Sequence, residues 1–177
     1  MVIKYLDSKR IKGLSTDTPT YETDFTTNTG WAATGTDVAV DSTTNDRLDF
    51  NIPNTANQTD AITYDLTSVS DSAWILRFKI VMDNFSVNTT GHAKKLLIGL
   101  SSTSHSTAVE SAQDAIGILF GSWSSGTKIR TRDSNGASWM DGSGTDFAET
   151  FVDNETYYVE IKRTLTTAYT VSLYSDS

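Results

Sequence analysis

Stretches in which apolar and polar residues alternate recur along the chain. The clearest is 73–82, where every second residue is large and apolar and the intervening positions include Arg77 and Lys79. Side chains of a β-strand point alternately to its two faces, so this pattern predicts a strand with one buried face. The same alternation occurs at 48–52, 62–66, 157–162 and 169–174.

Two other segments, 96–100 and 116–120, are apolar almost throughout, which is typical of strands covered on both faces. Segment 128–132 alternates more weakly. Turn-forming residues lie between the runs, at 124–126, 133–136 and 141–142. Short strands separated by such turns predict an antiparallel β-sandwich.

The composition agrees with an all-β domain. The chain has 177 residues, which is the size of one domain, and it is rich in Ser and Thr. It contains no Cys, which excludes disulfides and thiolate metal sites. No apolar run approaches the roughly 20 residues of a membrane span. We therefore expect a single sandwich over residues 21–177.

Charge divides the chain into a basic arm, residues 1–20, and an acidic body. Lys4, Lys9, Arg10 and Lys12 lie at the start of a chain whose net charge is −8. An acidic body repels phosphates, so nucleic acid and anionic membranes are poor partners, and we expect neither. The arm is expected either to be a disordered or edge-pairing terminus or to dock on a neighbouring subunit. It lacks the apolar stretch of a signal peptide.

The sequence carries no recognisable catalytic pattern. A glycosidase needs two carboxylates facing one groove. The acidic pair at 22–24 is explained by a solvated strand, and Glu110 and Asp114 lie in a polar connection without a strand around them. Glu160 is expected to form a surface pair with Lys162. His92 and His105 lie in polar loops without a Gly-x-Ser-x-Gly motif. We therefore expect that the protein is not an enzyme.

Calcium is the metal that best suits this composition, because Asp, Asn and main-chain carbonyl oxygens are its usual ligands. Asp41, Asn45 and Asp46 form one oxygen-rich turn and are the candidate ligands. The turn 133–136 resembles part of a calcium loop, although a hairpin turn accounts for the same residues.

Four tryptophans divide into two groups. Trp74 lies in the best amphipathic strand and is expected in the core. Trp31, Trp123 and Trp139 lie among small polar residues, without the periodicity of a buried strand. Each is expected either to form a stacking platform for a sugar ring or to fold over a sheet edge.

Several of these segments together resemble the laminin-G-like modules of the concanavalin A-like lectin/glucanase superfamily. The residues that carry the resemblance are 71–78, 98–101, 112–117, 156–163 and 169–174. The resemblance implies a jelly-roll sandwich of two curved antiparallel sheets, which binds glycans or proteins, often with calcium at its rim. Family members usually continue with further strands, so the chain is expected either to lack them or to receive a strand from elsewhere.

The leading functional hypothesis is a non-catalytic module that binds an extracellular or cell-surface glycan or glycoprotein through its rim loops. Two tryptophans would stack on sugars and polar residues would bond hydroxyl groups. The candidate residues are Trp123, Arg130, Arg132, Asp133, Asn135 and Trp139. The alternative is a structural subunit of a virion or extracellular filament, which self-associates through its arm and an open sheet edge. Both hypotheses place the protein outside the cell or on a virion.

Overall fold

The structure is a computed structural model that describes residues 21, 23–51, 60–67, 69–83, 94–101, 114–123, 126–135, 139–140, 152, 154–166 and 168–175. At positions 94–95, 114–115, 123, 132–135, 139–140 and 175 it describes the main chain alone. All regular structure in these residues is β-strand, and every strand pairing is antiparallel. The all-β prediction is therefore confirmed.

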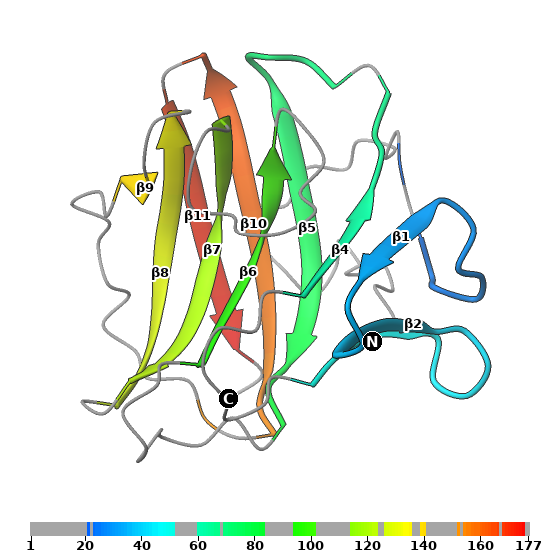
Figure 1. The fold of residues 1–177 in the computed structure, drawn as a ribbon. Coiled ribbons are helices and arrows are strands. Elements are labelled where there is room, and N and C mark those ends of the chain that lie inside the picture. The colour runs from blue at the N-terminus through cyan, green and yellow to red at the C-terminus, as the bar shows by residue number, and fades with distance from the viewer. Residues whose placement is uncertain are drawn as a thin grey trace.

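Two larger sheets contain most of the strands (Figure 1). The three-stranded sheet has the order β11-β10-β5 and consists of β5 (Trp74–Val81), β10 (Thr156–Leu165) and β11 (Ala168–Ser175). The four-stranded sheet has the order β6-β7-β8-β9 and consists of β6 (Lys94–Ser101), β7 (Asp114–Trp123), β8 (Gly126–Asn135) and β9 (Trp139–Met140).

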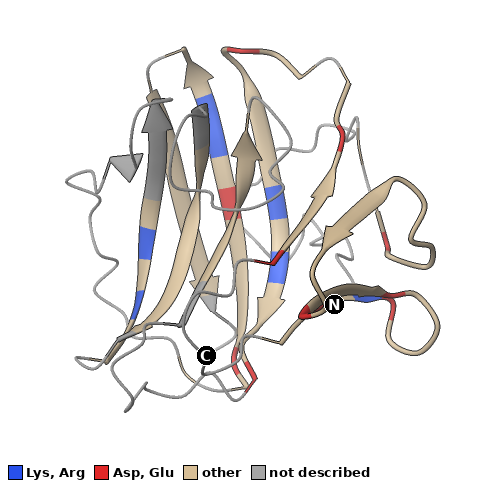
Figure 2. Ribbon diagram, in the orientation of Figure 1, with Lys and Arg blue, Asp and Glu red and all other residues tan. Residues whose placement is uncertain are grey.

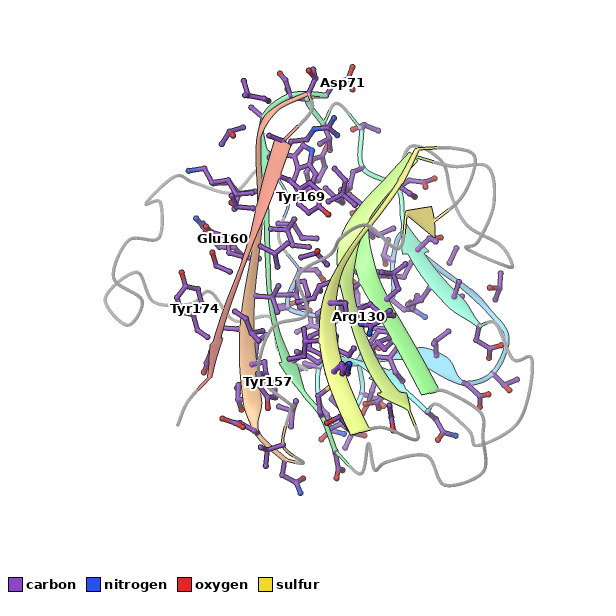
Figure 3. All side chains as sticks on the ribbon, turned by 90° about the vertical axis from the view of Figure 1, so that its left-hand side faces the viewer. Asp71, Arg130, Tyr157, Glu160, Tyr169 and Tyr174 are labelled. Atoms are coloured by element: carbon purple, nitrogen blue, oxygen red, sulfur yellow. The ribbon has the colours of Figure 1, made fainter. Side chains whose placement is uncertain are left out.

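The two larger sheets lie face to face, and side chains fill the space between them (Figure 3). Both sheets contribute to one continuous core, which gives the protein a sandwich-like architecture. The buried residues of this core are Phe78, Ile80, Met82, Leu96, Ile118, Phe120, Ile129, Tyr157, Val159 and Ile161. Trp74 is half-buried and packs against the core, in agreement with the sequence-based expectation.

Strand β10 shows the alternation most clearly. Tyr157, Val159 and Ile161 retain at most 2% of their exposure. The buried Tyr157 hydroxyl donates a hydrogen bond to the Glu155 carboxylate at 3.0 Å and accepts one from the Val152 amide at 2.6 Å. Because a buried hydroxyl without a partner is destabilising, these bonds allow a polar atom at the end of the core.

Strand β7 is covered on both faces, as its continuous apolar sequence predicts. Ile118 and Phe120 are fully buried against the other sheet. Leu119 points to the opposite face and is still only 5% exposed. The alternation of this strand is thus hidden in the sequence because both of its faces exclude water.

Two small strand pairs flank the sandwich (Figure 1). They are β1 (Trp31–Thr34) with β4 (Ala61–Tyr64), and β2 (Val38–Asp41) with β3 (Arg47–Phe50). Asp60 fastens the β1–β2 turn by accepting hydrogen bonds from the amides of Thr36 at 2.8 Å and Asp37 at 2.7 Å. Gly35 lies directly against this carboxylate with φ of +90°, a place with no room for a side chain.

The alternating and apolar runs all correspond to strands, whereas β1, β2 and β9 were not predicted. β9 has two residues, and no alternating run continues beyond the four residues of β1 or of β2, as it does at 48–52 and 62–66. The expected turn at 133–136 is misplaced, because 133–135 belong to β8 and pair with β7. The proposed arm, 1–20, and the expected turn at 141–142 lie outside the described residues. No helix of the described part is long and apolar enough to cross a membrane.

Gly99 and Gly117 face each other across β6 and β7 at a point of close approach. A Cβ atom on Gly99 would lie 2.7 Å from the Gly117 Cα and closer still to the Ile116 carbonyl oxygen. We expect Gly99→Ala to destabilise the fold by about 1–3 kcal/mol through overpacking. Chemical denaturation measures this change. If there were room for the Cβ atom at position 99, Gly99→Ala would instead stabilise the protein by about 0.4–1 kcal/mol, because Ala restricts the conformations of the unfolded chain. That outcome would contradict the close approach.

Candidate functional site

Most of the rim residues expected from the sequence lie on one strand and its short neighbour. Arg130 and the segment 132–135 belong to β8, and Trp139 begins β9. Trp139 pairs with Ser134, so it lies beside Asp133 and Asn135 at the end of the four-stranded sheet. The side chains of 132–135 and 139 lie outside the described set. Their role as a binding rim stays a prediction.

Trp123 lies far from this group. It ends β7 and pairs with Gly126 at the start of β8, whereas Trp139 pairs with Ser134. Eight residues of an extended strand separate Gly126 from Ser134, which corresponds to about 27 Å. The fold therefore places the two tryptophans at opposite ends of the sheet. One short oligosaccharide would not reach both positions.

Arg130 is half-buried rather than fully exposed on β8. Its position pairs with the buried Leu119, on the side of the sheet opposite the core residue Ile129. Arg130 already interacts with other groups of the protein. It is thus less available to a ligand than a loop position would be.

Trp31 is part of an aromatic cluster that its polar neighbours in sequence did not reveal. Its ring lies 5.5 Å from the buried Phe25 ring and 5.1 Å from the Tyr64 ring, between centroids. Trp31 pairs with Tyr64 across β1 and β4, and the ring is half-buried. These contacts favour the covering role over the sugar platform, because offset ring contacts stabilise the strand pair.

The candidate calcium ligands belong to the turn between β2 and β3. Asp41 accepts hydrogen bonds from the Asn45 side-chain amide at 2.6 Å and from the Thr44 main-chain amide at 3.1 Å. Asp46 adopts a positive φ of 49° and closes the turn. Both Asp41 carboxylate oxygens therefore bond to the turn itself. Among the described residues, no group of three or more His, Asp or Glu side chains could hold a metal ion.

A different surface combines aromatic rings with charge: the outer face of the three-stranded sheet, which we call the outer face. The alternation that sends core residues inward sends the other residues of β5, β10 and β11 outward. Glu160 and Tyr174 point away from the second sheet (Figure 3). The outer face consists of Ile75, Arg77, Lys79, Val81, Thr156, Tyr158, Glu160, Lys162, Thr170, Ser172 and Tyr174.

An ion pair occupies the centre of the outer face. Arg77 and Glu160 stand opposite each other on β5 and β10, and Arg77 Nε lies 2.8 Å from Glu160 Oε2. Their side chains are 24% and 15% exposed, so the pair is largely shielded from water. The contact with Glu160 uses only Nε of the guanidinium. Arg77 Nη2 is buried without a hydrogen-bond partner among the described residues.

Two tyrosines lie next to this pair in one row across the sheet. Tyr158 stands opposite Tyr174 on one side and opposite Lys79 on the other. The Lys79 ammonium group lies 5.9 Å from the centroid of the Tyr158 ring, a cation–π contact. Tyr174 is 39% exposed. The outer face thus presents aromatic surface, a guanidinium and a carboxylate within neighbouring rows.

The sequence suggested a different partner for Glu160. Lys162 shares its face two positions along the strand, but Arg77 stands directly opposite in register and takes the carboxylate. Strand register is a property of the folded sheet, so the local spacing of residues in the sequence does not reveal this pair. The tyrosines did leave a signal, since Tyr158 and Tyr174 occupy the polar phase of two alternating strands.

Comparison with known proteins gave no match: no protein-family model, curated protein or solved structure is significantly similar to the chain. The function of this chain is therefore inferred from its own residues and geometry.

The Asp41 turn makes the stability of the protein depend on pH. The hydrogen bond from Asn45 is the main reason that the pKa of Asp41 lies below its ordinary value. A lowered pKa stabilises the folded state above about pH 4, and this contribution disappears as the pH falls through the lowered pKa. We expect Asp41→Asn to lower the melting temperature at pH 6 more than at pH 3. An equal effect at both pH values would contradict this assignment.

Proposed function

We propose that the protein is a non-catalytic module that binds glycan on the outer face. The observation that carries the proposal is the row formed by Lys79, Tyr158 and Tyr174 beside the Arg77–Glu160 pair. Pyranose rings have apolar C–H faces that pack on aromatic rings, and their hydroxyl groups both donate and accept hydrogen bonds. A tyrosine pair next to a guanidinium and a carboxylate supplies all three kinds of contact.

A binding role fits the outer face better than catalysis. Acid–base hydrolysis of a glycosidic bond requires two carboxyl groups about 5–10 Å apart. Glu160 is the only acidic residue of the outer face, and Arg77 already engages it. The Glu160 carboxylate already accepts a hydrogen bond from Arg77 Nε, and no second carboxyl group stands beside it on the outer face.

Three further features belong to the same proposal. The sandwich would have the jelly-roll connectivity of the concanavalin type. Residues 132–135 and 139, which belong to the four-stranded sheet, would form a second binding surface at the end of β8. Calcium at Asp41, Asn45 and Asp46 would support the turn between β2 and β3. The module would act outside the cell or on a virion.

Removing the tyrosine pair tests the site. We expect Tyr158→Ala/Tyr174→Ala to weaken binding to any glycan found on an array by about tenfold or more, because truncated aromatic anchors typically cost more than 1 kcal/mol each. Isothermal titration measures the loss. Tyr21→Ala is the matched control, since Tyr21 is also 39% exposed but lies off the outer face. Unchanged binding in a folded double variant would remove the outer face as the site.

Assembly is the second candidate function, favoured by the edge strand β11. Within the described residues, β11 pairs with β10 alone and is therefore the edge strand of its sheet. Its eight residues include no charged residue and no proline. Charged residues and prolines usually protect the edge strands of natural proteins. An edge strand without them can pair with a strand of another chain. This property suits a structural subunit of a virion or extracellular filament.

Light scattering after size exclusion tests this assembly. We expect the mass of the native chain to rise with concentration and Thr170→Lys/Ser172→Lys to shift it toward the monomer, because charge on an edge opposes strand pairing. Thr43→Lys/Thr44→Lys places the same charge on an exposed turn and should leave the mass unchanged. A native chain that is monomeric at every concentration would contradict the edge-pairing role.

A further inference from the structure

The outer face differs in charge from the rest of the described part of the chain. It carries three cations and one carboxylate, visible on β5 and β10 in Figure 2. The other charged side chains of the described part are mostly acidic. They are Asp24, Asp37, Asp41, Asp46, Asp49, Asp60, Asp65, Asp71, Asp83 and Glu155, against Arg47, Lys128, Arg130 and Arg163. A local positive surface has thus formed on a chain with a net charge of −8.

Most of this positive charge is not neutralised within the described residues. Glu160 pairs with Arg77. Lys79 lies over the Tyr158 ring and Lys162 is exposed, and neither has a carboxylate within ion-pair distance in the part of the chain described. Ammonium groups without a carboxylate partner attract an anion, since charge complementarity raises both the rate and the selectivity of association.

The cations are distributed along the sheet rather than gathered at one point. Lys79, Arg77 and Ile75 are successive outward positions of β5, and Lys162 stands opposite Ile75 on β10. Lys79 and Lys162 are therefore four residues apart along the strand direction, or about 13 Å. A ligand that meets both must be extended and must carry separated negative groups.

We propose that the ligand of the outer face is an acidic polysaccharide, a chain of pyranose rings that bear carboxylate or sulfate groups. This inference rests on the proposed glycan-binding function and adds the charge of the ligand. Tyr158 and Tyr174 contact the ring faces, while Lys79 and Lys162 meet successive anionic groups. Glu160 turns its charge toward Arg77 and so repels the ligand less than a free carboxylate would.

The surroundings of the outer face disfavour a denser polyanion. Asp71 and Asp83 lie just beyond the two ends of β5, so the positive zone is bounded along the strands. A nucleic acid carries a phosphate at every nucleotide and would extend its charge onto acidic surface. A sparsely charged sugar chain can align its anionic groups with the cations and its neutral parts with the tyrosines.

The experiment compares two pairs of polysaccharides, and the members of each pair share a backbone and differ in charge. Binding of the full chain to dextran sulfate, dextran, carboxymethylcellulose and hydroxyethylcellulose is measured by isothermal titration at low and high salt. We expect the chain to bind the charged member of at least one pair, dextran sulfate or carboxymethylcellulose, and salt to weaken this binding. The neutral member of the same pair, dextran or hydroxyethylcellulose, should bind little. The responding pair identifies sulfate or carboxylate as the anionic group.

Charge-removing variants connect this binding to the outer face. We expect Lys79→Gln/Lys162→Gln to lose about tenfold in affinity for the acidic polysaccharide. Arg47→Gln is the control, because Arg47 is also cationic but pairs with Asp49 on β3, away from the outer face. Circular dichroism and the melting temperature verify that each variant is folded.

The possible outcomes are distinct. Equal binding to the charged and neutral members of a pair, unaffected by Lys79→Gln/Lys162→Gln, would overturn the acidic ligand and leave the glycan-binding function intact. Equal binding to polyglutamate or duplex DNA, with no effect of Tyr158→Ala, would show charge attraction alone and overturn the carbohydrate class. Absence of binding to all four polysaccharides and to a broad glycan array would overturn the proposed function as well.

Discussion

Burial of alternate side chains between two sheets is the constraint on which the rest of this structure depends. Strand β10 pairs with a strand on each side and directs Tyr157, Val159 and Ile161 into the core. Once these residues are buried, the intervening ones must face outward, because a shift of one residue would exchange the two sets. The packing of the core-facing side chains thus decides which residues of the three-stranded sheet form the outer face.

The Arg77–Glu160 pair shows how register turns this constraint into a site. The two residues are 83 positions apart in sequence and become direct neighbours when β5 pairs with β10. Fixing the guanidinium and the carboxylate in place reduces the side-chain freedom that a ligand would otherwise have to remove on binding. The neighbouring tyrosines are held by the same two pairings, so the surface is organised before any ligand arrives.

Hydrogen bonds of aspartates organise the flanking strand pairs by a different principle. Asp60 holds the β1–β2 turn and Asp41 holds the β2–β3 turn through main-chain amides and one side-chain amide. The oxygen-rich composition that suggested calcium is therefore used, at these two places, to satisfy the chain's own donors. An acidic, Ser- and Thr-rich sequence of this kind produces turns as readily as metal sites, since the same oxygen atoms serve both.

The sequence by itself determined the strand phases, because alternation over five or more residues is a direct record of which side faces water. It also contained the tyrosines on the polar phase of β10 and β11. It did not determine the very short strands, the position of the turn after β8, the cluster around Trp31 or the partner of Glu160. Each of these depends on which strands pair and in what register, and that choice is made by contacts between segments distant in the chain. Tertiary structure alone therefore decided that Arg77, Glu160 and the two tyrosines form one surface, and that Trp123 and Trp139 do not lie together.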